Sequence, residues 1–88
     1  MIVRVLGEGR YEVPSEALPG IEALDETLGA AVDAGDEPAM TSALAGLIAA
    51  IRAAGTAVAP DDLRVSELVV PHEGSSLDEV VGLLAGDT

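Results

Sequence analysis

The sequence predicts an α+β domain in which a small, mainly antiparallel sheet packs against helices on one face. Three observations predict this class: a glycine-containing segment with strand alternation at the start, two adjacent helical patterns in the middle, and a short aliphatic run followed by another helical pattern. The expected order is strand, strand, helix, helix, strand, helix. We expect a single domain that spans residues 1–88.

The first element is a predicted β-hairpin in residues 1–14, with Gly7-Glu8-Gly9 as its loop. The cross-strand pairs expected for this loop are Val5 with Tyr11, Arg4 with Glu12 and Val3 with Val13. A phosphate-binding glycine loop is the alternative, but it would need a third glycine and a following helix, whereas strand alternation follows Gly9. The glycines are therefore predicted to turn the chain.

The second face of this hairpin carries Ile2 and Leu6 on either side of Arg4, so it is neither cleanly polar nor cleanly apolar. Either later parts of the same chain cover it, or a partner protein or a second copy does. Ile2, Arg4 and Leu6 are therefore candidate partner-binding residues.

Two amphipathic helices are predicted next. The first begins near Pro19 and ends at Gly35, and Asp36 is the expected N-cap of the second, which ends at Gly55. Their apolar positions are Ile21, Leu24, Leu28, Ala31 and Val32 in the first helix and Met40, Leu44, Leu47, Ile48 and Ile51 in the second. Because only two residues separate the patterns, an antiparallel helix hairpin is expected. Surface alanines on the second helix leave self-association as an alternative.

The remaining residues predict a connector at 56–60, a turn at 60–63, a third strand at Leu68–Val70 and a final helix. Ser76 and Glu79 form a capping-box pattern at the start of that helix. Its apolar positions are Leu77, Val80, Val81, Leu83 and Leu84.

Composition limits the function. Sixteen acidic residues against four arginines and no lysine give a net charge of −12, which repels phosphate backbones and anionic lipid headgroups. Direct binding of nucleic acid or membrane is therefore not expected. The chain has no cysteine, no signal-peptide pattern and no apolar run of membrane-spanning length, which predicts a cytoplasmic protein.

Carboxylates recur at helical spacing at Glu22, Asp25, Glu26 and Asp33, which predicts a solvated helix face; a divalent-cation site is the alternative. Residues 33–37 lack the ligand spacing of an EF-hand loop. Glu22, Asp25 and Glu26 are candidate partner-binding residues, because an acidic face can complement basic stretches on another protein.

Catalytic chemistry has little support in the sequence. His72 is the only histidine and lies beside a proline, with no second histidine at metal-protease spacing. Ser76 is explained as a helix cap, so it does not need to be a nucleophile. We therefore predict no catalytic residue, no metal site and no cofactor. The alternative is a small-ligand-binding or metal-binding protein, or an enzyme, that uses the surface carboxylates.

Several segments together resemble one small protein family. They are the start IVRVLGEG with Tyr11 and Val13, the junction AGDE at residues 34–37, and RAAGT at residues 52–56, and they resemble the PspA-associated protein family, PspAA. The resemblance implies association with PspA-type phage-shock proteins, which are coiled-coil, membrane-remodelling relatives of the ESCRT-III superfamily that act in envelope stress. It brings no catalytic residues. It implies a non-enzymatic adaptor that binds a PspA-like coiled-coil protein and meets the inner membrane only through that partner.

Overall fold

The computed structural model describes residues 1–84 of the 88-residue chain. Its elements are β1 (Ile2–Val5), β2 (Gly9–Glu12), a single 3-10 turn η1 (Ser15–Ala17), α1 (Leu18–Asp33), α2 (Glu37–Ala54), β3 (Thr56–Ala57), β4 (Leu68–Val70) and α3 (Leu77–Leu84). The predicted α+β class and the order of the main elements are confirmed. The two-residue strand β3 is an addition to that order.

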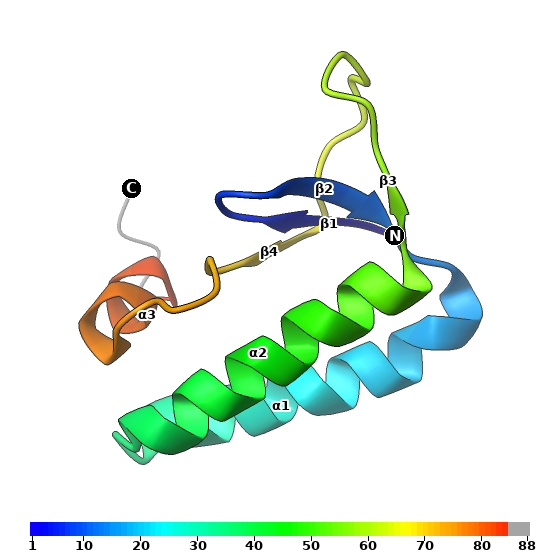
Figure 1. Cartoon of the computed structure of the whole chain (residues 1–88). Coiled ribbons are helices and arrows are strands. Elements are labelled where there is room, and N and C mark those ends of the chain that lie inside the picture. The colour runs from blue at the N-terminus through cyan, green and yellow to red at the C-terminus, as the bar shows by residue number, and fades with distance from the viewer. Residues whose placement is uncertain (85–88) are drawn as a thin grey trace.

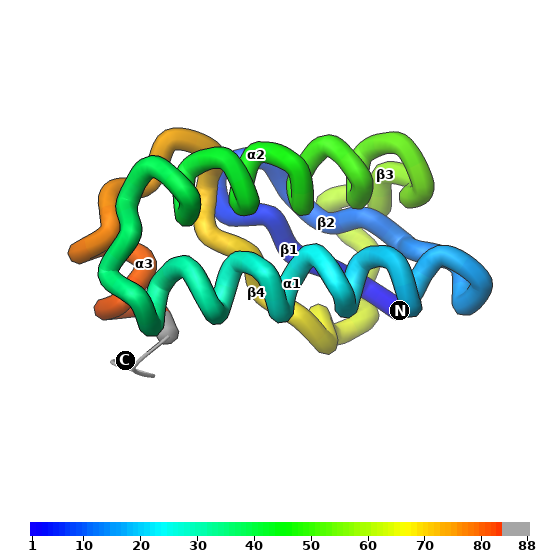
Figure 2. Tube along the Cα trace, turned by 90° about the horizontal axis from the view of Figure 1, so that it is seen from below, coloured from blue at the N-terminus to red at the C-terminus, as the bar shows by residue number. Residues whose placement is uncertain are grey.

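The four strands form one mixed sheet in the order β3-β2-β1-β4. The pairs β1–β2 and β2–β3 are antiparallel, and β1 and β4 run parallel. Helices α1 and α2 lie antiparallel, side by side, across one face of the sheet (Figures 1 and 2). The short helix α3 lies at the end of the layer where α1 turns into α2 (Figure 2).

Residues 56–60 were predicted as a connector only, and here the structure differs. Tyr11 lies opposite Ala57 and Glu12 opposite Thr56, so the chain leaving α2 runs as a strand along the free edge of β2. The backbone N–H of Val58 extends this pairing by donating to the oxygen of Arg10 at 2.9 Å. A strand of two residues is too short to show an alternation of apolar and polar residues, so only its pairing with β2 identifies it.

The hairpin is formed as predicted, but its predicted loop and register are wrong. Val3 lies opposite Tyr11, Arg4 opposite Arg10 and Val5 opposite Gly9, so the loop is residues 6–8. The physical reason is a tight turn in which the N–H of Glu8 donates to the oxygen of Val5 at 3.0 Å, with Gly7 at φ +83° in its third position. Gly9 therefore begins β2.

The change of register moves the pairing by two residues, and so it keeps every side chain on its predicted face. Val3, Val5 and Val13 are at most 1% exposed and face the helices. The expected Arg4–Glu12 pair does not form, and two arginines face one another instead.

The core lies between the sheet and the helix pair. The predicted apolar positions of α2, namely Met40, Leu44, Leu47, Ile48 and Ile51, are all buried, as are Ile21, Leu28 and Ala31 of α1. They pack with Val3, Val5 and Val70 of the sheet, with Val13 directly after β2 and with Val80 of α3. Val81 is instead 46% exposed, and the prediction for the Leu84 side chain lies outside the described residues.

The predicted helix caps are present. The Asp36 side chain accepts a hydrogen bond from the N–H of Ala39 at 3.1 Å. At α3 the Glu79 N–H donates to the Ser76 hydroxyl, and the Ser76 N–H donates to the Glu79 carboxylate at 2.9 Å, which completes the capping box.

Candidate functional site

The face of the sheet that is turned away from the helices carries a cleft. The chain between β3 and β4, residues 58–67, rises from this face and returns to it (Figure 1). We call this stretch the β3–β4 segment. A cleft of about 770 Å³ lies between it and the sheet, and we call this the outer cleft. Its lining includes Arg4, Arg10, Leu63, Arg64, Val65 and Val69.

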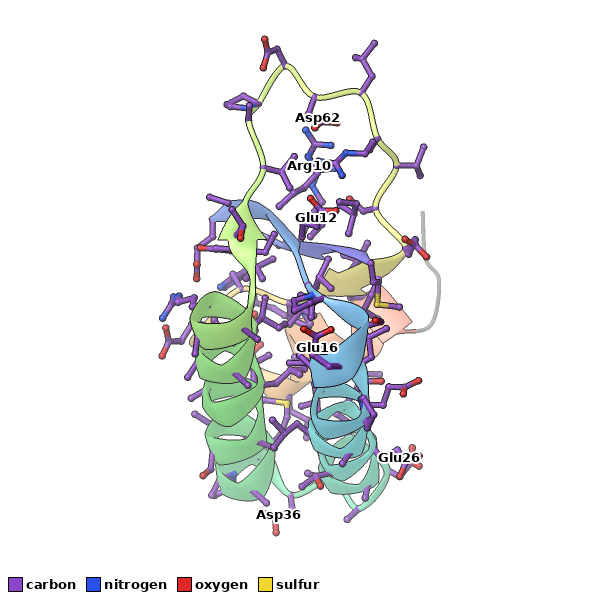
Figure 3. The ribbon with its side chains drawn as sticks, turned by 90° about the vertical axis from the view of Figure 1, so that its right-hand side faces the viewer. Arg10, Glu12, Glu16, Glu26, Asp36 and Asp62 are labelled. Carbon is purple, nitrogen blue, oxygen red and sulfur yellow. The ribbon has the colours of Figure 1, made fainter. Side chains whose placement is uncertain are left out.

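Arg10 holds the β3–β4 segment in place. Its guanidinium donates to three backbone oxygens, those of Arg64 and Asp62 at 2.6 Å and that of Ala59 at 3.1 Å. Figure 3 shows Arg10 rising from β2 between the two limbs of the segment, with Asp62 beyond it. Charged hydrogen bonds to backbone oxygens are stronger than neutral ones, so one side chain can fix a segment that has little secondary structure.

Arg64 completes the arrangement from within the segment. Its guanidinium pairs with the carboxylate of Asp62 at 2.9 Å and with that of Glu12, on β2, at 3.1 Å. Asp62 also accepts the backbone N–H of Arg64 at 2.9 Å. These contacts lower the pKa of Asp62 to about 2, with the guanidinium of Arg64 as the main cause. The charge of Arg64 is therefore already balanced by two carboxylates.

Arg4 is in a different position. It is exposed in the middle of the cleft floor, between its strand partners Arg10 on β2 and Val69 on β4. Among the described residues, none forms an ion pair with it. Three of the four arginines in the chain line this cleft, against two lining carboxylates, those of Glu8 and Asp62. Because Arg64 is balanced by Asp62 and Glu12, Arg4 is the lining arginine that no side chain or backbone oxygen of the described residues engages.

Aliphatic side chains accompany this positive charge. Leu63 is 95% exposed and Val65 is 82% exposed, both on the β3–β4 segment, and Val69 of β4 is 42% exposed. Single exposed aliphatic residues are ordinary, but three around one cleft are typical of an interaction surface.

The structure separates the three hairpin residues that the sequence grouped as candidates. Ile2 is 5% exposed, and its backbone bonds to Glu67, whose N–H donates to the Ile2 oxygen at 2.8 Å. Leu6 is half-buried, and its N–H donates to the oxygen of Val70 at 3.0 Å. Later parts of the chain thus cover Ile2 and flank Leu6, which was one of the two interpretations left open. Arg4 alone of the three faces the outer cleft.

The acidic candidates form a second, separate surface. Glu22, Asp25 and Glu26 are all exposed on α1. Figure 3 shows Glu26 on the outer side of α1, far from Arg10 and Asp62. Within residues 1–84, no group of three or more carboxylate or histidine side chains is close enough to hold a metal ion.

Glu8, the acidic residue of the glycine-containing turn, has a structural role. It pairs with Arg52 at the end of α2, and it accepts a hydrogen bond from the Tyr11 hydroxyl at 2.8 Å. Arg52 lowers the pKa of the Glu8 carboxyl, and the bond to Glu8 raises the pKa of Tyr11. Arg52 also reaches Glu73 at 3.3 Å. This network joins the hairpin turn, α2 and the loop after β4. It also places the negative charge of Glu8 in the glycine-containing turn, where a phosphate-binding loop would need positive charge.

The loop around His72 is explained by local hydrogen bonds. His72 is exposed, with its Nε2 atom 3.5 Å from a carboxylate oxygen of Glu79. Ser75 is buried and donates its hydroxyl to the His72 backbone oxygen at 2.6 Å. Hydrogen bonds from the backbone and side chain of Ser76 lower the pKa of Glu79. These polar groups are thus engaged in turns and caps.

The sequence does not reveal the outer cleft, because the arginines that line it, at positions 4, 10 and 64, form no cluster along the chain. The one available signal was strand alternation, which places Arg4 and Arg10 on the same face of the hairpin. Nothing local indicated that the β3–β4 segment would fold over that face.

Comparisons with known proteins add one finding. The model of the family described as PspA-Associated protein, PspAA, matches residues 1–88, the whole chain. No curated protein and no solved structure matches it. Among the described helices, none has the length and apolar character needed to cross a membrane.

Proposed function

The chain belongs to the PspA-associated protein family, and on this premise we propose that it is a non-enzymatic adaptor that binds a PspA-type coiled-coil protein. The observation that carries the proposal is the family match over residues 1–88. The family name describes an association and names no reaction. We further propose that the adaptor acts as one domain, in the cytoplasm, in a phage-shock type of membrane-stress response, and meets the membrane only through its partner.

The polar groups of the described chain support a binding role over a catalytic one. Within this part, no buried side-chain nitrogen or oxygen lacks a hydrogen-bond partner. Several carboxylates are engaged within the structure: Asp36 caps α2, Glu79 accepts the Ser76 N–H in the capping box of α3, Asp62 pairs with Arg64 and Glu8 pairs with Arg52. Catalytic sites usually leave polar groups with perturbed environments facing a cleft and free to react. Here the groups with shifted pKa values belong to ion pairs and caps.

We propose the exposed acidic face of α1 as one contact with the partner. Glu22, Asp25 and Glu26 present their charges to solvent. Charges of this kind speed the encounter with a basic surface and favour one partner over another, and salt weakens the effect.

The test is direct binding between this chain and the PspA-type protein encoded in the same genome, with both purified and association followed by biolayer interferometry. We expect saturable binding that survives washing and is absent with an unrelated coiled-coil protein. Equal signals from the two proteins, or none from either, would contradict the proposal.

A further inference from the structure

We propose that the outer cleft is the docking site for an acidic, aliphatic segment of the protein partner. In this arrangement a carboxylate of the segment pairs with Arg4, and its apolar side chains pack on Leu63, Val65 and Val69. The inference rests on the proposed function, because it assigns a surface and a segment chemistry to that partner.

Two arginines face each other on the floor of the outer cleft. Arg4 and Arg10 are direct strand partners, and like charges placed opposite each other destabilise a sheet. Arg10 is engaged by three backbone oxygens, and Arg64 is balanced by Asp62 and Glu12. Arg4 is the cation that a carboxylate from outside can still neutralise. Such a carboxylate would relieve the repulsion and gain a charged hydrogen bond.

Leu63 and Val65 form an apolar part of the outer cleft. They are almost fully exposed, yet they lie on a segment fixed by Arg10 and by the turn in which Asp62 accepts the Arg64 N–H. A segment already ordered before binding loses less conformational entropy when a partner packs against it. The structure thus holds two aliphatic side chains in water at a fixed position beside a cation.

An extended anionic surface does not fit the outer cleft. A lipid bilayer surface would meet Asp61, Asp62 and Glu67 of the β3–β4 segment at the same time as Arg4 and would be repelled by these carboxylates, whereas a segment with a single carboxylate can reach Arg4 alone. A nucleic-acid backbone would meet the same repulsion. A protein segment with one carboxylate among aliphatic side chains satisfies Arg4 and also covers the apolar residues.

The β3–β4 segment, which borders the outer cleft, and helix α1, which carries the acidic face, lie on opposite sides of the sheet (Figure 1). An acidic segment is attracted at the cleft and repelled at α1, so it can dock in one place only. The separation of positive charge at the cleft from negative charge on α1 therefore favours an acidic segment as the ligand and fixes the side of the molecule on which it docks.

The experiment uses the full chain and the PspA-type protein of the same genome, with dissociation constants measured for two variants and two matched controls. The variants are Arg4→Gln and the double change Leu63→Ser with Val65→Ser. The control for charge is Ser42→Asp, on the exposed surface of α2, and the control for apolar exposure is Val81→Ser, on α3. We expect each variant to weaken binding about tenfold or more, and the controls to stay within about twofold of wild type.

The outcomes separate this inference from the proposed function. Binding by wild type that none of the variants weakens would overturn the docking site and leave the adaptor function standing. If the wild-type chain does not bind the PspA-type protein, the proposed adaptor function fails. The docking site is then tested separately, by measuring the binding of a helical peptide that has Leu on one face and Glu on the other. Binding of that peptide must then fall in both variants and in neither control; an equal affinity in all, or no binding, overturns it.

A second copy of the chain is the remaining occupant to test. Light scattering over a range of concentrations would reveal it. Self-association that the Leu63→Ser and Val65→Ser double variant abolishes, without any change in partner binding, would assign the cleft to a second copy and overturn the inference.

Discussion

The Nη2 atom of Arg10 lies 2.6 Å from the backbone oxygen of Asp62, although the two residues are 52 positions apart. Through this contact and its two companions, a side chain of the hairpin shapes a loop that follows the helix pair. These hydrogen bonds tie β2 to the segment that borders the outer cleft.

Replacement of Arg10 by Gln should loosen the β3–β4 segment. A Gln side chain is too short and has too few donors to reach the oxygens of Ala59, Asp62 and Arg64 together. Amide hydrogen exchange in residues 60–66 should accelerate about tenfold or more, while exchange in α2 stays unchanged. Equal acceleration in both regions would mean that the change unfolds the whole protein and does not act on the segment.

Gly55 is predicted to be intolerant of a side chain. A Cβ atom there would lie 2.8 Å from the backbone oxygen of Ile51 and 3.0 Å from the Cβ atom of Tyr11, where the end of α2 passes β2. Gly55→Ala should lower the free energy of unfolding by about 1–3 kcal/mol through overpacking. Urea denaturation measures this value.

Gly46 provides the matched control. It lies within α2, and a Cβ atom added there has no neighbour within 4 Å. Gly46→Ala should raise the free energy of unfolding by about 0.5–1 kcal/mol, because alanine favours the helix and restricts the unfolded chain. If the two substitutions change stability in the same direction, the close approach at Gly55 is not the cause.

The ion pair between Asp62 and Arg64 should break only at strongly acidic pH. Its pKa of about 2 in the folded protein lies below its ordinary value of 3.8, so the contribution of the Asp62–Arg64 pair to stability is complete above pH 4. That contribution is lost as the pH falls from about 4 to about 2. Carboxyl NMR titration should follow this transition, and Arg64→Gln should move the pKa of Asp62 back up. An unchanged pKa in the variant would refute the assignment of the cause to Arg64.

Neutralising the acidic face of α1 should slow the association with the PspA-type protein. In the triple variant Glu22→Gln, Asp25→Gln, Glu26→Gln, the association rate at low salt should fall about threefold to tenfold, with a smaller change at high salt. A triple variant with Thr41→Lys, Ser42→Lys and Ala49→Lys on the exposed surface of α2 changes the net charge equally and is the control. Equal slowing in both variants would point to net charge and away from this face.

Divalent cations should leave the melting temperature unchanged. A metal ion bound only by the native state at 100 times its dissociation constant would add about 2.7 kcal/mol, which for a domain of this size is a shift of roughly 10–20 °C. Scanning calorimetry with calcium, magnesium and zinc measures the shift. A saturable rise with any one of them would favour the metal-binding alternative over an adaptor without a cofactor.

The sequence predicted correctly those features that depend on interactions between residues only a few positions apart. The Asp36 cap and the Ser76–Glu79 capping box are local hydrogen bonds, and each was expected at its observed place. The stripe of apolar residues on α2 is likewise set by helix geometry. The hairpin register was not determined at this level, because loops at residues 6–8 and 7–9 keep the same side chains on the same faces.

By itself, then, the sequence determined the fold class, the order of the main elements, the helix ends and the faces that form the core, together with the resemblance to the PspA-associated family. Only the tertiary structure decided that β4 runs parallel to β1, that Ile2 is covered, and that Arg10 binds oxygens 49 to 54 residues away. The physical reason is the distance along the chain over which each interaction acts. Periodicity and capping act over one or two turns of chain, whereas the outer cleft depends on where a long, irregular segment crosses the sheet, and that is fixed only when all the elements have packed.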